Sequence, residues 1–312
     1  MTVFKYVEDK DVFQKFYSRM LSRRLVNSTQ ASDEAEASMI TKLKEACGFE
    51  YTNKLQRMFQ DMGVSKDLEK AFLDSLTDRD SLGRTLLHKN AFLTVVDFSI
   101  LVLSTASWPL TPPTTSFNLP NELIKSYDRF HSFYTTKHSG RKLTWLTNLS
   151  RGEMKANYSK HSRVPYTFTV STYQMGILLP YNTTDTHTYE ELQAITNLNK
   201  DSLDGALGVI VKAGVLLIEP RNQTPGQTPG QKFHLNLDYK SKKLRVNLNQ
   251  GIKTEQKQES DETHKTIEED RRMLIQVSQR LHSFKDLSWH YLSFYYDLSF
   301  HYDLSLRLWP TI

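Results

Sequence analysis

The chain has 312 residues, of which 38% are hydrophobic and 24% are charged. This is the balance of a globular protein, with enough apolar residues for one large core or two to three small ones. The net charge of +5 permits acidic protein partners or nucleic acid and demands neither. A single cysteine, Cys47, excludes an intramolecular disulfide and a multi-cysteine metal site, and it suits a reducing compartment.

Two features of the sequence bear on localisation. No uninterrupted apolar run reaches the roughly 18 residues that a membrane-spanning helix requires. Residues 1–5 are followed at once by acidic and basic residues, which is not the pattern of a signal peptide. We therefore expect a cytoplasmic and nuclear protein without a membrane partner.

The first third of the chain has the apolar spacing of amphipathic helices. Asp33 with Glu36 resembles a capping pair, and Gly48 and Gly63 are placed to end two of the helices. Amphipathic helices joined by short links predict a helical bundle. The helices are expected over residues 11–26, 34–47 and 52–62, and from residue 65 onward.

The periodicity changes after a helix that begins at Pro120 and a stop at Gly140. At two places β-branched and aromatic residues alternate with polar ones, which predicts strands. Thr188 and Glu191 form a capping box for a helix within a winged-helix-like order of elements. These elements are strands over residues 142–146 and 166–171, helices over 172–179, 188–195 and 203–212, and a strand over 215–218.

Two later strands are expected over residues 233–239 and 243–249, joined into a hairpin by the turn Lys240-Ser241-Lys242. The loop that precedes them holds two copies of the tetrapeptide Thr-Pro-Gly-Gln, at residues 224–227 and 228–231. This composition predicts a flexible, solvated loop.

Together these elements predict an α+β fold that is mainly helical. Residues 1–135 would form the helical bundle, with an atypical insert near residues 81–96. Residues 136–252 would form an α/β, winged-helix-like region. Residues 253–279 resemble a linker and a helix, and residues 280–312 a disordered or irregular, low-complexity aromatic tail.

No catalytic constellation stands out in the sequence. The twelve glycines are scattered and form no phosphate-binding loop, and the ten histidines lack the spacing of metal ligands. Cys47 ends an apolar stripe without a basic activator on the same face, which predicts a buried structural thiol. We therefore expect a protein that is not an enzyme, with no catalytic residue, metal or cofactor.

Two groups of basic residues are candidates for a binding surface. Composition alone leaves two readings open: a solvated polar face, or a groove for an acidic polypeptide. The first group shares one helix face and the second lies on the expected hairpin. The groups are Arg19, Arg23 and Arg24, and Lys240, Lys242, Lys243 and Arg245.

Several segments resemble the cullin family. Residues 138–145 (HSGRKLTW) and 243–247 (KLRVN) are the most specific, and residues 4–13 (FKYVEDKDVF) resemble the family's entry into its C-terminal region. The resemblance runs from about Val3 to Gln276 and is nearest to the type that scaffolds SCF ligases. Residues 36–40, 47–52, 55–61, 108–109 and 267–271 also resemble the family.

The resemblance implies a noncatalytic scaffold of a cullin-RING ubiquitin ligase. Such a scaffold binds a RING-box protein by accepting a strand into its α/β region, and a basic canyon steers the acidic tail of the ubiquitin-conjugating enzyme. A cullin exchange factor is a further implied partner. The two basic groups would form the canyon, and the RING-box-binding region would contain Leu143, Thr144, Trp145, Leu244 and Val246.

The sequence also departs from the family. Residues 81–96 do not resemble it, the repeats that hold adaptor and substrate receptor are expected to be missing, and so is the domain with the modifier-acceptor lysine. Lys285, in a segment unlike the acceptor motif, is not expected to be neddylated.

The sequence bears on three alternatives to this function. A winged-helix nucleic-acid binder is disfavoured, because residues 188–197 contain Glu190 and Glu191 and no Lys or Arg. A metal-dependent hydrolase lacks ligands. A nonfunctional truncated product stays open.

Overall fold

A computed structural model describes residues 3–27, 33–76, 78–79, 85–86, 98–113, 115–160, 164–220, 223–249, 264–265, 267–273 and 275–276. The chain divides into two units, Met1–Ile252 and Lys253–Ile312. In the second unit every described residue is helical, in agreement with the helix expected there. The aromatic tail at 280–312 lies outside the described residues. Most of the expected insert near residues 81–96 also lies outside the described residues. The exception is the short strand β2 (Thr85–Leu86), which pairs with β1 (Asp78–Arg79).

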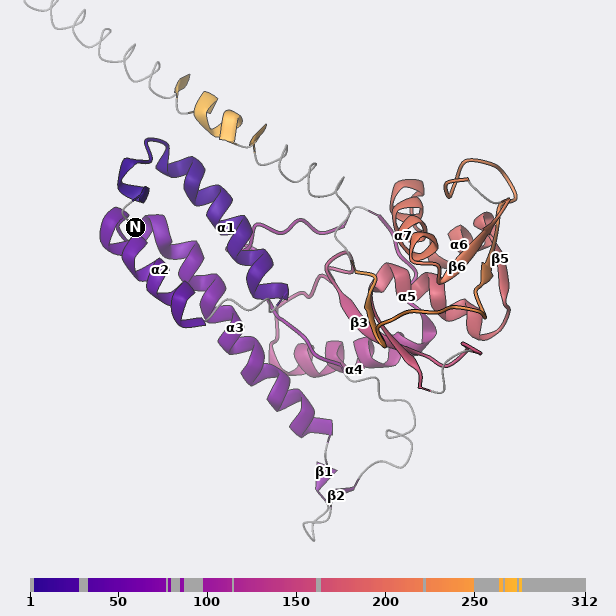
Figure 1. Ribbon diagram of the computed structural model, residues 1–312. Coiled ribbons are helices and arrows are strands. Elements are labelled where there is room, and N and C mark those ends of the chain that lie inside the picture. The colour runs from indigo at the N-terminus through magenta and orange to yellow at the C-terminus, as the bar shows by residue number, and fades with distance from the viewer. Residues whose placement is uncertain are drawn as a thin grey trace, which may run out of the picture. The chain divides into compact units, whose positions relative to one another are not determined.

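The N-terminal part is helical, as expected (Figure 1). A short 3₁₀ turn, η1 (Val3–Tyr6), precedes α1 (Lys10–Asn27), α2 (Asp33–Cys47) and α3 (Phe49–Leu76). Gly48 separates α2 from α3 in the left-handed conformation at φ +86°, where a side chain would be strained. The buried core between these helices contains Leu21, Leu25, Ile40, Leu43, Leu55, Met58 and Trp108.

One prediction in this part is wrong. Gly63 does not end a helix, because α3 runs through it without a break. Glycine costs about 1 kcal/mol in a helix interior, and side chains on either side of Gly63 bond to one later segment. Asp61 accepts hydrogen bonds from Ser104, and Ser65 bonds to the backbone of Val102. These contacts hold both halves of α3 in line.

The predicted cap of α2 stays a prediction, because the side chain of Asp33 lies outside the described residues. The Glu36 carboxylate binds Tyr17 and Arg24 on α1 and so joins the two helices.

Helix α4 (Asn121–Lys137) begins after Pro120, as predicted. Its buried side packs against the C-terminal half of α3 through an aromatic cluster. Phe130 lies at the centre, with ring centroids 5.2 Å from Phe72 and 6.2 Å from Trp145.

The strand expected over residues 142–146 is not formed. This segment belongs to no helix or strand, and the strand lies farther along, at β3 (Arg151–Ala156). The alternation arises because Leu143 and Trp145 pack on the aromatic cluster of α4 while Thr144 is exposed. A segment without regular structure that packs every second side chain against α4 therefore has the same alternation of apolar and polar residues as a strand.

The α/β part contains two sheets of three strands each. In the first, β4 (Tyr166–Ser171) lies between antiparallel β3 and parallel β8 (Arg245–Asn247). In the second, β7 (Lys232–Leu235) lies between β5 (Thr186–Thr188) and β6 (Leu216–Glu219), and both pairs are antiparallel.

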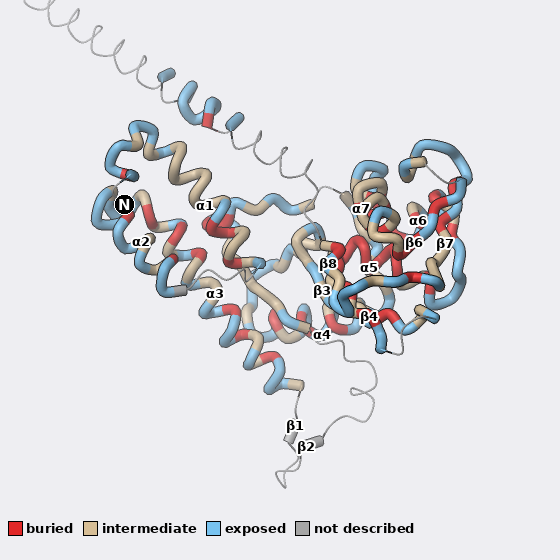
Figure 2. The backbone as a smooth tube through the Cα atoms, in the orientation of Figure 1, coloured by how far each residue is buried: buried red, intermediate tan, exposed pale blue. Residues whose placement is uncertain are grey.

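Helices α5 (Thr172–Leu178), α6 (Tyr189–Thr196) and α7 (Lys200–Lys212), with the 3₁₀ turn η2 (Leu179–Asn182), share one core with both sheets. The predicted capping box of Thr188 and Glu191 is confirmed. Figure 2 shows α5 coloured as buried, and all of its residues are buried. None of the described helices is long and apolar enough to cross a membrane.

The predicted hairpin of residues 233–249 is wrong, because β7 and β8 belong to different sheets. Tyr239 is buried between them, with its ring 5.2 Å from Tyr166 and 5.5 Å from Phe168. With this ring buried against the first sheet, the chain leaves the second sheet after β7, and Arg245 then pairs with Thr167. A tight hairpin turn would instead have kept the chain beside β7.

The loop with the repeated Thr-Pro-Gly-Gln differs from its prediction as well. Gln231 is only 1% exposed. Its side chain accepts a hydrogen bond from the Gly226 amide at 2.8 Å and donates to Gln223 at 3.0 Å and to the Thr224 carbonyl at 3.1 Å. The loop is thus closed around a buried glutamine and is not simply solvated.

Candidate interaction surface

The residues predicted to bind a RING-box protein lie in two places. Leu143 and Trp145 pack in the aromatic cluster of α4, with Thr144 exposed between them. Val246 contacts the core of the α/β part from β8, and Leu244, just before that strand, is 50% exposed. The structure assigns the two segments to different cores.

The first sheet has open edges among the described residues. Both sides of β4 are paired, to β3 and to β8, whereas β3 and β8 are each paired on one side only. Hydrogen bonds join β4 to the chain just before and just after β8. The Thr167 amide donates to the Leu244 carbonyl and the Leu248 amide donates to the Thr169 carbonyl, both at 2.8 Å. An edge strand offers unpaired N–H and C=O groups to another chain.

Within the first basic group, Arg24 is committed to a contact inside the protein. Its Nε donates to Glu36 Oε1 at 2.5 Å and its Nη2 to Oε2 at 3.1 Å. The Tyr17 hydroxyl donates to the same carboxylate at 2.9 Å, and the Tyr17 ring lies 5.6 Å from the guanidinium. Glu36 is only 8% exposed, so these three side chains join α1 to α2 with a partly desolvated ion pair.

This environment acts on the Tyr17 hydroxyl. Burial raises the pKa of Tyr17 well above its usual range, and the neighbouring Glu36 carboxylate raises that pKa further. The hydroxyl therefore remains a donor to Glu36. Arg19 and Arg23, on the same helix, are half-buried.

The second basic group is much more open. Lys240, Lys242 and Lys243 are exposed, and none of them forms an ion pair with another residue that the structure describes. Arg245 has an 80% exposed side chain and lies 3.8 Å from Glu153 Oε1 on β3. An exposed pair at this distance contributes about 0–1 kcal/mol, so Arg245 remains available to an anion.

Sequence reasoning missed Arg151 and Lys155 on β3, because that strand was not expected. Arg151 donates from Nη1 to Asn27 Oδ1 at 3.2 Å and from Nη2 to the Asn27 carbonyl at 2.7 Å. These bonds connect the last residue of α1 to the first residue of β3. Lys155 is exposed.

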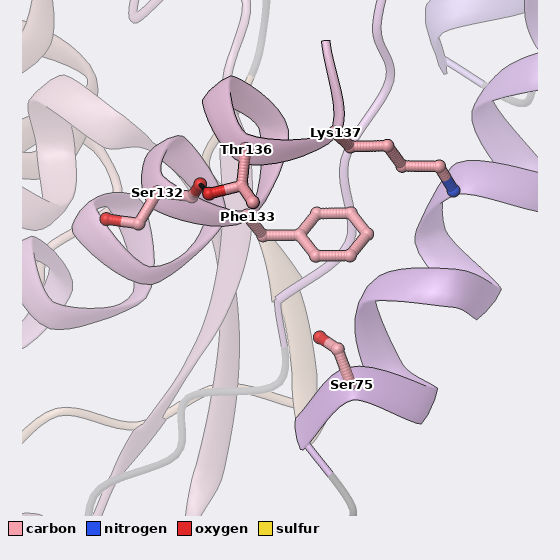
Figure 3. A pocket seen from close by; sticks show the side chains of 5 residues that line it. All are labelled: Ser75, Ser132, Phe133, Thr136 and Lys137. Atoms are coloured by element: carbon pink, nitrogen blue, oxygen red, sulfur yellow. Dashed lines mark hydrogen bonds between the residues drawn. The ribbon is translucent and has the colours of Figure 1, made fainter. Parts of the chain in front are cut away.

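The other candidates for chemistry show no catalytic arrangement within the part of the chain that the structure describes. Cys47 is half-buried against the N-terminal core, and no cluster of three metal-ligating side chains occurs in the described ranges. A shallow groove lies between the ends of α3 and α4, with the Lys137 ammonium 5.6 Å from the Phe133 ring (Figure 3). Its lining is Ser75, Ser132, Phe133, Thr136 and Lys137, a set without an acid–base pair.

Comparison with known families matches two regions of the chain. Residues 1–69 match the cullin alpha solenoid domain, and residues 102–239 match the cullin alpha+beta domain. The first range covers α1, α2 and most of α3, and the second covers α4 and every strand of the two sheets except β8. The chain belongs to the cullin family.

Its similar relatives include proteins named cullin-1. The chain is 50% identical over 274 residues to cullin-1 of Schizosaccharomyces pombe, which is 88% of this chain and 34% of that protein. It is 45% identical over 278 residues to cullin-1 of Dictyostelium discoideum, covering 89% and 35%, and 40% identical over 277 residues to cullin-1 of Caenorhabditis elegans, covering 88% and 34%. The chain thus spans about a third of the length of these relatives.

Proposed function

We propose that this chain acts as a noncatalytic scaffold in a cullin-RING ubiquitin ligase. It would hold a RING-box protein and position a ubiquitin-conjugating enzyme, so that transfer is accelerated by proximity rather than by a cullin nucleophile. Membership of the cullin family and the similarity to cullin-1 proteins support this assignment. The observation that carries it is the sheet β3-β4-β8, whose strands β3 and β4 lie in the matched alpha+beta domain and whose outer strands have open edges among the described residues.

The RING-box protein would add a strand to this sheet. Strand addition pairs the free backbone groups of an edge and leaves specificity to alternate side chains. Leu244 and Val246 flank or lie on the β8 edge, which suits such a role. Leu143, Thr144 and Trp145 would support the α/β region from the side of α4, without taking part in chemistry.

The basic residues would form the canyon for the acidic tail of the conjugating enzyme. Surface charge of this kind raises encounter rates while adding little affinity, which suits an enzyme that must exchange rapidly. The exposed Lys240, Lys242 and Lys243 would contribute most, because Arg24 is already paired with Glu36.

Co-expression with a RING-box protein followed by size-exclusion chromatography tests the central assignment. We expect the two chains to elute together, and hydrogen exchange to slow at one edge strand, β3 or β8, while β4 changes little. A folded chain that does not co-elute at micromolar concentration would refute the assignment.

A second experiment tests the canyon alone. Reversing the charge of Arg23, Lys242 and Lys243 together should slow ubiquitin chain formation through slower association of the enzyme. Added salt should mimic the variant, because exposed charges are screened beyond about 8 Å at physiological ionic strength. An unchanged rate at low salt would remove these residues from the proposed canyon.

A further inference from the structure

We propose that the outer face of the sheet β3-β4-β8 is a track for an extended acidic polypeptide, and that it connects the two basic groups. The inference rests on the proposed function, since it extends the path of the acidic tail across residues that, apart from Arg245, neither group contains. It is carried by the register of the sheet and by the contact between α1 and β3.

The register fixes which side chains share the outer face. Tyr166, Phe168 and Val170 are buried in the core, so the alternate residues of β4 point to the other side. Their partners on β3 and β8 share that side. The outer face therefore carries Thr167, Thr169 and Ser171 in the middle, Arg151, Glu153 and Lys155 on one flank, and Arg245 and Asn247 on the other.

All eight side chains of the outer face are polar, and all are exposed or half-buried. Three of them are cations, and Glu153 is the only acidic one. Glu153 lies 3.8 Å from Arg245, so this carboxylate offsets part of the charge at the centre of the track.

The two ends of the track coincide with the two basic groups. At one end Arg151 is bonded to Asn27, four residues after Arg23 on α1. At the other end Lys155 pairs with Thr167, which pairs in turn with Arg245, directly after the lysines at 240–243. The distance along β3 from residue 151 to residue 155 is about 13 Å, at roughly 3.3 Å per residue.

An extended acidic chain fits this face. Its side chains on one side recur about every 6.7 Å, which is also the spacing of Thr167, Thr169 and Ser171 along β4. Hydroxyl groups can donate to carboxylates, and cations on both flanks keep the chain centred. Single-stranded nucleic acid fits less well, because the outer face has no aromatic side chain on which a base could stack.

Binding of a fluorescent 20-residue poly-aspartate peptide to the full chain, measured by anisotropy, tests the proposal. Lys155→Gln should weaken binding about two- to fivefold, the range for one exposed ion pair. Glu153→Gln should strengthen it by a similar factor. Thr169→Val should weaken binding without changing its dependence on salt, because only a hydroxyl donor is lost. Lys212→Gln, an exposed lysine of α7, is the matched control and should change nothing.

The outcomes separate this proposal from the canyon itself. If Lys242→Gln with Lys243→Gln weakens binding while the variants of Lys155 and Glu153 bind like the unmodified chain, the track is refuted and the canyon stands. If the substitutions at Lys242, Lys243, Lys155 and Glu153 all leave binding unchanged, both the track and the canyon are refuted. Tighter binding of an oligothymidylate of equal charge would assign the face to nucleic acid and overturn the proposal.

Discussion

The Nε1 of Trp108 donates a hydrogen bond of 2.8 Å to Oδ2 of Asp61, across 47 residues of sequence. The backbone amide and the hydroxyl of Ser104 donate to the same oxygen, at 2.8 and 2.7 Å. One carboxylate on α3 therefore anchors the segment that follows residue 98. The same bonds account for a helix that continues past Gly63.

Asp61→Asn should destabilise the protein by about 1–3 kcal/mol, because a neutral amide oxygen replaces a charged acceptor for three donors. The measurement is urea unfolding followed by tryptophan fluorescence and by circular dichroism. Asp67→Asn on the exposed side of α3 is the control and should lie within about 0.5 kcal/mol of the unmodified chain. Equal stability of the two variants would mean that Asp61 does not anchor the segment.

Glu36→Gln should also destabilise the protein, since it leaves the half-buried Arg24 without its countercharge. We expect a loss of about 1–3 kcal/mol in urea unfolding, because a charge-assisted contact is lost at a site that water only partly reaches. Arg24→Gln alone should cost a comparable amount, and the double variant should cost less than the sum of the two. Additive losses would show that the two side chains do not act as a pair.

Gly152→Ala tests the packing under β3. A β-carbon at this position would lie 2.4 Å from the terminal methyl of Met175, so the methionine must move. Because the contact is with the far end of a flexible side chain, moving it costs little, and we expect a loss of less than about 1 kcal/mol in thermal or urea unfolding, and a smaller loss when Met175→Ala is already present. Gly208→Ala in α7 meets no atom within 4 Å and should instead stabilise the protein by about 0.4–1 kcal/mol. A loss of more than about 2 kcal/mol at Gly152→Ala would mean that the Met175 side chain cannot move aside.

The pH dependence of stability should reflect Tyr51. Burial raises the pKa of Tyr51 to about 12, and its hydroxyl donates to the Lys10 carbonyl. A raised pKa means that this tyrosine adds stability below its unfolded pKa of about 10, and that the contribution disappears as the pH rises from there to about 12. Absorbance at alkaline pH, compared between the parent and Tyr51→Phe, should show one phenol titrating late. A Tyr51 titration near its ordinary pKa would refute the assignment.

Much of the local structure could be predicted from sequence, and much of the pairing could not. Thr188 and Glu191 are three residues apart, so their capping box is a local matter that the sequence contains. The pairing of β8 with β4 depends on where Tyr239 is buried, and no local pattern specifies that. Residues 142–146 resembled a strand because their side chains alternate between apolar and polar. That alternation reflects packing on α4, a contact that the local sequence does not show.

The candidate surface shows the same division. The basic residues were visible as groups, but the ion pair that occupies Arg24 links two helices and left no mark in the spacing. Arg151 and Lys155 escaped notice because their strand was not expected. Which strands lie at an edge, and which charges pair, depends on contacts between residues far apart in the chain. Local sequence patterns do not reveal those contacts.

The parallel pairing of β8 with β4 has a consequence for synthesis on the ribosome. Gln174, at the start of α5, donates from Nε2 to the carbonyl of Leu248, 74 residues later. Until residue 248 has left the exit tunnel, the first sheet consists of β3 and β4 alone, and isolated two-stranded hairpins are marginal in water. Until then, Thr167 and Thr169 are unpaired on the side that β8 will occupy, so the first sheet reaches its final pairing only after residue 248 has emerged.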